Sequence, residues 1–303
     1  MKIRRLFLAG LTLNILSLAY LQAHGAGSKS PSSVPPKAGV ASDGGNVTCF
    51  GGSVAPGIYS NLNIAGFCNV DSGSVTVEHN LTVLPGGTLN AQFGGTDAVP
   101  ASDVTVGGNV DVQSNAVLVL GCEPVHFICA NDPDQSVGSY STADTVAGNL
   151  TAEDALAVVV HATAIGHNVT LNGGGGGVTC NGFIPELLAP PYGDFEDITI
   201  GNNLTISGWQ SCWLGAFRDT IRGNVNWQSN VTADPDGNEI ATNSIGRNLN
   251  CTGNSPNPQI GDSGGSLNLV SGNANGQCAN LKLLPGQQPV VGDNQARKQF
   301  PRR

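Results

Sequence analysis

The chain has 303 residues, of which 42 are Gly and only 12% are charged. No Lys or Arg occurs between Lys37 and Arg218, a stretch that holds sixteen Asp and Glu residues. Once the three basic residues at the N-terminus are set aside, 10 basic residues face 22 acidic ones, a net charge of −12. Because so acidic a surface repels phosphate groups, the composition excludes nucleic acid and anionic lipid as partners.

The N-terminal region predicts export. Residues 1–25 have the pattern of a secretory signal peptide, with a charged start, an apolar run over Leu6–Tyr20 and small residues near Ala23. Residues 26–45 are rich in Ser, Pro and Gly, which predicts a flexible linker. No later segment is apolar enough to span a bilayer. We therefore expect the protein to be secreted, either extracellular or held at the cell surface.

A nine-residue unit recurs through most of the remaining chain, and its clearest copy is Ile198–Ile206. It consists of two apolar-polar-apolar segments separated by Gly201-x-Asn203. Period-2 alternation places the apolar side chains on one face, and Gly and Asn tolerate the positive φ of a sharp bend. The other copies are Val75–Val83, Val104–Val112, Asp144–Ala152, Thr163–Leu171, Asp219–Trp227 and Asn243–Cys251.

The spacing of these copies predicts a solenoid. Successive bend asparagines lie 19 to 40 residues apart, and the short intervals define a coil of about 20 residues that must stack to bury its apolar face. We predict an all-β fold, a right-handed parallel β-helix over residues 46–278. A leucine-rich repeat is the competing solenoid, but here an apolar residue directly follows the Asn. The bend asparagines should stack as a ladder along the axis: Asn80, Asn109, Asn149, Asn168, Asn203, Asn224 and Asn248.

Two insertions interrupt the repeat, at about 121–143 and 173–197. Loops carried by a rigid scaffold are where binding and catalytic residues usually lie, so these are the first places to look for function.

The eight cysteines of an exported chain predict disulfides. Eight cysteines allow 105 pairings, but order along a solenoid favours near neighbours. The first and last pairs would staple the two ends of the β-helix, and residues 279–303 would form an unstructured, basic-ended tail. The predicted pairs are Cys49–Cys68, Cys122–Cys129, Cys180–Cys212 and Cys251–Cys278.

Both ends of the repeat region also resemble a known group. Asn46-Val47-Thr48-Cys49 through Phe67-Cys68, and Asn248–Pro256 through Gly276-Gln277-Cys278, are similar to the opening and closing elements of uncharacterised secreted bacterial proteins, especially actinobacterial ones. Those proteins are predicted to be β-helical. The resemblance covers about residues 46–278 and implies a fold and a compartment, but no activity.

The sequence offers two weak candidates for a metal site. Cys122-x3-His126-x2-Cys129 has thiolate and imidazole ligands, but it lacks a fourth ligand and lies in an oxidising compartment. Four acidic residues precede strand segments, and register stacking would bring them near one another. Arg218 and Arg222 could neutralise Asp219, and Ca²⁺ with oxygen ligands could neutralise the other three. We favour solvated strand starts and no metal for these residues: Asp103, Asp144, Asp197 and Asp219.

Aromatic and imidazole side chains are the remaining candidates for ligand contact or catalysis. Trp209 and Trp213, beside Cys212, would form a platform for sugar rings if exposed, although packing is the simpler interpretation and Trp227 occupies an inward position. Three histidines have no evident partner and are interpreted as structural: His79, His161 and His167.

These observations lead to two functional hypotheses. The first is a secreted or cell-envelope β-solenoid with a structural or binding role, whose partners are carbohydrate or envelope components, without catalysis. The alternative is a carbohydrate-active hydrolase or lyase with carboxylates on one β-helix face. A groove that holds two or three carboxylates and a basic group would favour the enzyme.

Overall fold

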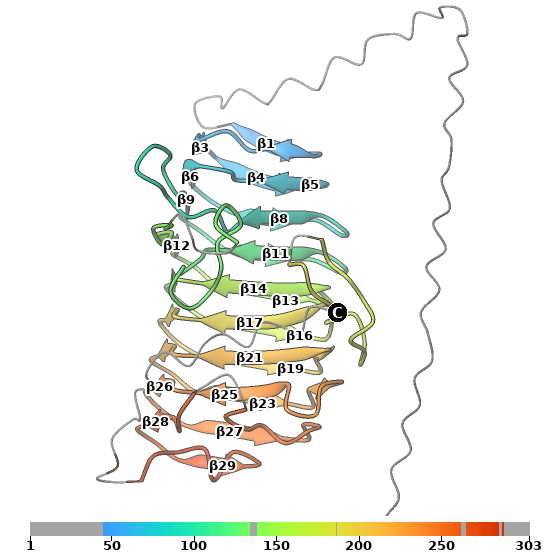
Figure 1. Ribbon diagram of the computed structural model, residues 1–303, viewed down its shortest axis with the longest axis vertical. Helices are drawn as coiled ribbons and strands as arrows, with labels where there is room; N and C mark the ends of the chain where they lie inside the picture. The colour runs from blue at the N-terminus through green and yellow to red at the C-terminus, as the bar shows by residue number, and fades with distance from the viewer. Residues whose placement is uncertain (1–44, 134–137, 186, 262–264, 285–286, 288–303) are drawn as a thin grey trace, which may run out of the picture. The chain divides into compact units, whose positions relative to one another are not determined.

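The computed structural model describes residues 45–133, 138–185, 187–261, 265–284 and 287, all within one unit, Ala38–Arg303. The predicted signal peptide, all but the last residue of the predicted linker, and most of the predicted tail lie outside these described residues. The described chain is all-β and contains no helix. Its strands form three long parallel sheets, which confirms the predicted parallel β-helix (Figure 1).

Most coils of the helix contribute one strand to each sheet in turn. Sheet A contains β1 (Asn46–Cys49), β4 (Asn61–Ile64), β7 (Leu81–Val83), β10 (Val110–Val112), β13 (Leu150–Glu153), β16 (Val169–Asn172), β19 (Leu204–Ser207), β23 (Val225–Gln228), β27 (Leu249–Thr252) and β29 (Ala274–Gly276). Sheet B contains β2 (Gly52–Ser53), β5 (Phe67–Asn69), β8 (Thr88–Ala91), β11 (Val117–Leu120), β14 (Ala157–His161), β17 (Tyr192–Glu196), β21 (Trp213–Phe217) and β25 (Asn238–Ala241). Sheet C contains β3 (Gly57–Tyr59), β6 (Gly73–Val77), β9 (Ser102–Val106), β12 (Asp144–Val146), β15 (Thr163–Ile165), β18 (Thr199–Ile200), β22 (Thr220–Ile221), β26 (Ser244–Ile245) and β28 (Leu269–Val270), and a separate pair is formed by β20 (Gln210–Ser211) and β24 (Val231–Thr232).

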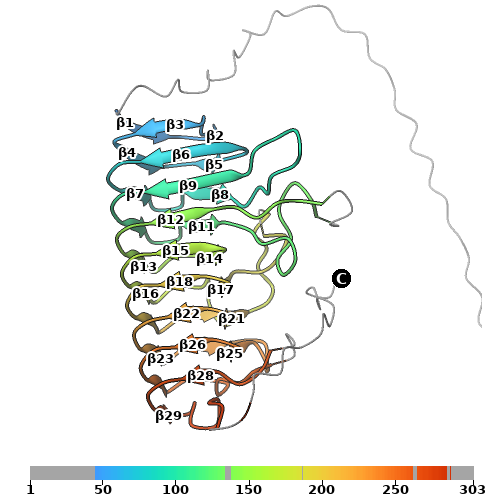
Figure 2. The same ribbon diagram turned by 90° about the vertical axis from the view of Figure 1, so that its left-hand side faces the viewer.

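The apolar alternation of the repeat fills the interior of the helix. In sheet A, Leu204 lies between Val169 and Val225 in the register, and all three side chains are fully buried. Equivalent columns from all three sheets make one continuous core cluster. Figure 2 shows the coils stacked along one axis, with successive strands of sheet C facing the viewer.

The predicted asparagine ladder is present at the corner between sheets C and A. The Oδ1 atom of Asn168 accepts from the backbone N–H and the Nδ2 of Asn203, each at 3.2 Å. Asn203 repeats the pattern with Asn224, at 2.8 and 3.1 Å. Similar bonds continue from Asn61 to Asn273, so each coil satisfies a backbone donor of the next.

The geometry that repeats at this corner also explains its glycines. The predicted reason, a positive φ, was wrong. Neither Gly201 nor Asn203 has positive φ. Instead, a Cβ atom at Gly201 would lie 1.9 Å from the carbonyl oxygen of Gly166 in the preceding coil. The glycine is therefore required because adjacent coils approach closely, and only Gly leaves room for that approach.

Two further amide ladders occur at the other corners, and the sequence did not predict them. Between sheets A and B, Asn230 accepts from Trp209 N and Asn254 accepts from Asn230 N, both at 3.0 Å. Between sheets B and C, Asn243 accepts from Asp219 N at 2.9 Å, and Asn268 accepts from Asn243 N at 3.0 Å.

The disulfides are the four pairs predicted from chain order: Cys49–Cys68, Cys122–Cys129, Cys180–Cys212 and Cys251–Cys278. The β-helix continues beyond the predicted boundary at residue 278. Leu281 and Leu283 are buried, and Asn268 donates from Nδ2 to the Leu281 carbonyl at 3.0 Å. The start of the predicted tail thus packs on the last coil, because its leucines cover the open end of the core.

Both insertions lie over the outer face of sheet B. The second contributes Ile184 and Ala189 to an apolar cluster with outward residues of β11, β14 and β17. Phe127 of the first insertion packs against the same cluster. In Figure 1 the first insertion crosses the strands of sheet B. The outer face of sheet B is therefore covered over β11, β14 and β17, whereas Phe67 on β5 is 46% exposed.

Candidate functional site

A group of ionisable side chains lies on the covered outer face of sheet B. Asp194 and Glu196 are two residues apart on β17, so both point to the same side of the sheet. His161, the last residue of β14, stands directly opposite Glu196 in the parallel register. One nitrogen or oxygen from each of these three residues lies within 4.8 Å of the others.

The His161–Asp194 pair is almost fully buried. His161 Nε2 lies 3.2 Å from Asp194 Oδ2, and the two side chains are 0% and 4% exposed. Burial lowers the pKa of His161 to about 4 and raises the pKa of Asp194 well above its usual range. Both shifts favour the neutral form of the side chain, and the two residues share a hydrogen bond.

Glu196 and Arg218 connect this pair to the corner between sheets B and C. Arg218 donates to Glu196, and it also binds both oxygens of Asp197 at 2.9 Å. Burial alone would lower the pKa of Arg218, but its hydrogen bonds to Asp197 and the charge of Glu196 raise it. Burial and the nearby Asp194 raise the pKa of Glu196 to about 8.

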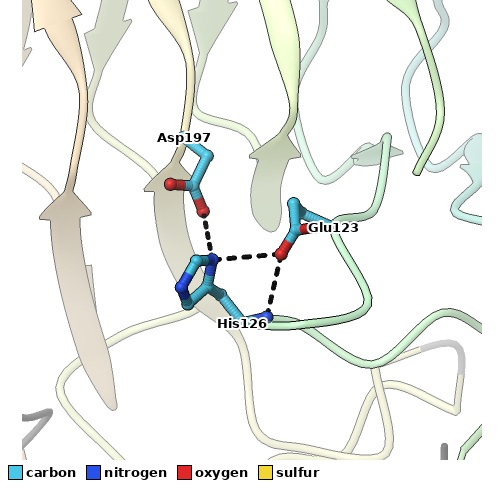
Figure 3. Close-up of side chains that lie close together, drawn as sticks. All are labelled: Glu123, His126 and Asp197. Atoms are coloured by element: carbon cyan, nitrogen blue, oxygen red, sulfur yellow. Dashed lines mark hydrogen bonds and ion pairs between the residues drawn. The ribbon is translucent and has the colours of Figure 1, made fainter. Parts of the chain in front are cut away.

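A second cluster, Glu123, His126 and Asp197, joins the first insertion to this corner (Figure 3). His126 Nδ1 lies 3.0 Å from Glu123 Oε2 and 3.3 Å from Asp197 Oδ2. Glu123 Oε2 also accepts from the backbone N–H groups of Val125 and His126, each at 3.0 Å. With Arg218 on Asp197, protein donors already occupy these oxygens, so the cluster acts as an ionic latch for the insertion.

Aromatic rings cover the ionisable group on its outer side. The Phe127 ring lies with its centroid 3.7 Å from that of His161. On the other side, Trp213 and Phe217 stack with centroids 5.5 Å apart, and Trp213 Nε1 donates to Glu239 at 3.1 Å. Gly215 lies beneath these two rings, because a Cβ atom there would be 2.2 Å from Trp213. The aromatic rings occupy the space in which a sugar ring would have to lie.

The carboxylates that precede the strand segments do not form a row along one edge. Asp144 and Asp219 occupy one column at the corner, but Thr163 and Ile198 separate them. The interpretation as solvated strand starts is wrong for these two residues, which are 2% and 1% exposed. Each accepts a backbone N–H, from Val104 at 2.6 Å and Ile198 at 3.1 Å respectively.

At the same corner, Arg218 and Arg222 do not have the partner that the sequence suggested. Arg218 pairs with Asp197 and Glu196 rather than with Asp219, and Arg222 is exposed. Asp103 accepts from Ala143 N at 2.8 Å, which ties the end of the first insertion to β9. These carboxylates therefore connect segments of the chain through hydrogen bonds and ion pairs. They do not converge on a common Ca²⁺ site: Asp103, Asp144, Asp197 and Asp219.

Trp209 and Trp213 also do not form an exposed aromatic platform. Trp209 is fully buried and donates from Nε1 to Ser211 Oγ at 3.0 Å, so it is not a ligand contact. Trp213 is half-buried among the covering rings, and Trp227 is buried in the core as expected. His79 and His167 are exposed.

His161 has a partner that the sequence did not indicate. The bond to Asp194 depends on how β14 and β17 align across the second insertion, which no repeat spacing specifies. The only sequence signal was the polar-apolar-polar order of Asp194-Phe195-Glu196, which places two carboxyl groups on one face. Cys122 and Cys129, considered as metal ligands with His126, are joined to each other instead.

Shallow cavities lie away from this group. One, of about 380 Å³, is lined by Asp154 and Gln210 and by glycines that include Gly173, Gly174, Gly176 and Gly177. Another, of about 380 Å³, lies along the asparagine ladder beside Arg222 and Arg247. No helix in the described chain is long and apolar enough to cross a membrane. No protein-family model, curated protein or solved structure matches this chain.

Proposed function

We propose that the protein is a secreted or cell-envelope β-solenoid with a structural or binding role, and that it does not catalyse a reaction. Four disulfides are compatible with an extracellular location, because such bonds persist in oxidising compartments. The predicted signal peptide supports the same compartment.

One observation carries the absence of catalysis: the best candidate constellation is roofed. His161 and Asp194 are buried beneath Phe127, and the remaining carboxylates are engaged by Arg218, His126 and Trp213. A polymeric substrate requires an open groove over its acid and base. The cavity beside Gly173 and the cavity beside Arg222 both lie away from this group, and neither pairs a carboxylate with a base.

The faces left open by the insertions suit a repetitive, neutral partner. Sheet C presents an outward column of exposed side chains that are mostly hydroxyls, interrupted by Ala164 between Thr145 and Thr199, with neighbouring strands about 4.8 Å apart. The strong negative charge of the chain disfavours anionic polymers. We therefore propose a neutral envelope polysaccharide as the partner, bound along a column that includes Thr105, Thr145, Thr199, Thr220 and Ser244.

Co-sedimentation of the purified chain with insoluble cellulose and chitin tests this proposal, with pectate as the anionic comparison. We expect retention on a neutral polymer, reduced by Thr145→Arg on sheet C. Val178→Arg, the same charge change at an exposed site of the second insertion, should leave retention unchanged. Absence of retention on every neutral polymer, or equal loss in both variants, would contradict the proposed surface.

The carbohydrate-active enzyme is the second candidate, because one observation favours it. A carboxyl whose pKa lies near 8, as for Glu196, suits a general acid at neutral pH. Release of reducing ends or unsaturated sugars from any tested polysaccharide, abolished in Glu196→Gln, would establish the enzyme and refute the non-catalytic role.

A further inference from the structure

The buried group on sheet B has more negative charge than its protein partners neutralise. If ionised, Asp194, Glu196 and Asp197 carry three negative charges, and Arg218 supplies one positive charge. Two negative charges therefore remain on carboxylates that are buried or only partly exposed, from 4% for Asp194 to 22% for Asp197. Leaving them unneutralised is costly, so either two protons or a divalent cation must accompany the fold.

The geometry of three of these side chains matches a cation site. His161, Asp194 and Glu196 each direct one ligand atom into a region where the atoms lie within 4.8 Å of one another. The separation of His161 Nε2 and Asp194 Oδ2 is 3.2 Å. Zinc bound tetrahedrally at about 2.0 to 2.1 Å would hold its ligand atoms about 3.3 Å apart.

An unpartnered atom gives an independent indication. Asp194 Oδ1 is buried and has no hydrogen-bond partner among the described residues. Buried polar atoms are normally paired, so this unpartnered oxygen on a residue of the cluster is accounted for by a bound ion or water. By contrast, the oxygens of the Glu123–His126–Asp197 latch already accept from backbone N–H groups and Arg218.

We propose that His161, Asp194 and Glu196 bind one divalent transition-metal ion of the Zn²⁺ class. One imidazole and two carboxylates are ligands that such ions accept, with water completing the coordination. Calcium is excluded by the ligand set, because it takes six to eight oxygen ligands and this site supplies a nitrogen. The ion would supply the missing positive charge and fix β14 to β17 beneath Phe127.

The test is zinc loading of the purified full-length mature chain, measured as bound metal after dialysis against buffer. We expect one zinc per chain. Asp194→Asn, which keeps the shape of the side chain, should weaken binding by at least about tenfold, since even outer-shell changes cost about 10- to 100-fold in metal affinity. His126→Gln, in the neighbouring latch, is the matched control and should retain full binding.

Co²⁺ absorption of the wild-type chain provides a readout that does not depend on whether a variant folds. Visible bands typical of a four-coordinate nitrogen and oxygen site, abolished by competing Zn²⁺, are expected. Failure of the wild type to retain zinc above the buffer blank would overturn the proposal, and would leave a protonated carboxyl pair in its place. Binding that is lost in His126→Gln but kept in Asp194→Asn would place the ion in the latch and also overturn it. Neither result bears on polysaccharide retention.

Discussion

Removing one rung of the asparagine ladder should destabilise the fold by more than its half-buried position would indicate. The Asn203 side chain donates to Asn168 Oδ1 at 3.2 Å and accepts from the N–H and Nδ2 of Asn224 at 2.8 and 3.1 Å. Asn203→Ala deletes all three bonds and leaves a backbone donor of the next coil unpaired. At about 1 kcal/mol for each bond, we expect a loss of about 2–4 kcal/mol in the free energy of unfolding.

The matched control is Asn172→Ala, which deletes a single exposed bond to Glu153 and should cost about 0.5 kcal/mol or less. Urea unfolding with the disulfides intact measures both variants, and the comparison requires an unchanged dependence on urea concentration. Hydrogen exchange at the Asn224 amide should rise in Asn203→Ala alone. If the two variants lost equal stability, the ladder bonds would contribute no more than surface contacts, and the reasoning would be refuted.

Three further predictions concern the ends, the latch and pH. Reducing the disulfides should raise hydrogen exchange first in the terminal coils. The bonds there close loops with separations of 19 and 27 residues and stabilise the fold by about 3 kcal/mol each. Loosening of the centre while both ends stay protected would contradict this prediction. Arg218→Met should lower the free energy of unfolding by about 1–2 kcal/mol, less than the loss of a fully buried pair because Arg218 is 27% exposed. It should also speed proteolysis of the first insertion. Arg222→Met, at an exposed position, should have neither effect. Burial raises the pKa of Asp144 to about 8, so its stabilising contribution is complete below the unfolded-state pKa near 3.8 and is lost as pH rises to about 8. Asp144→Asn should therefore gain in melting temperature relative to the wild type as pH increases over that interval, and a constant difference between the two would show that Asp144 is ionised in the fold.

The repeat region could be predicted because its information is local and periodic. Alternation over Ile198–Ile206 specifies which side chains enter the core, and the recurring Asn specifies where coils turn. The disulfide pairs could be predicted because coils that are adjacent in sequence stack on each other, which brings neighbouring cysteines together. The reason for Gly201 was missed, because a close approach between coils is a property of two coils and cannot be read from one.

The candidate site could not be predicted, because it depends on contacts between coils separated by insertions. His161 and Asp194 are 33 residues apart, and the intervening loop hides which residue of β17 lies opposite β14. Arg218 reaches back 21 residues to Asp197, whereas sequence proximity had suggested Asp219. Trp209 resembled a surface aromatic only because the strands that bury it come from other coils.

The buried acids at the corner between sheets B and C are best understood as part of the amide ladder there. In the same column, Asn243 Oδ1 accepts a backbone N–H and its Nδ2 donates to the Ala216 carbonyl at 3.0 Å. Asp219 also accepts a backbone N–H through Oδ1, while its Oδ2 has no donor among the described residues. Burial raises the pKa of Asp219 well above its usual range, which favours the protonated carboxyl, the form that resembles an amide in having one hydrogen-bond donor. Burial therefore favours a protonated carboxyl for the acids of this corner column, Asp144 and Asp219, whereas the proposed cation would neutralise the acids near His161.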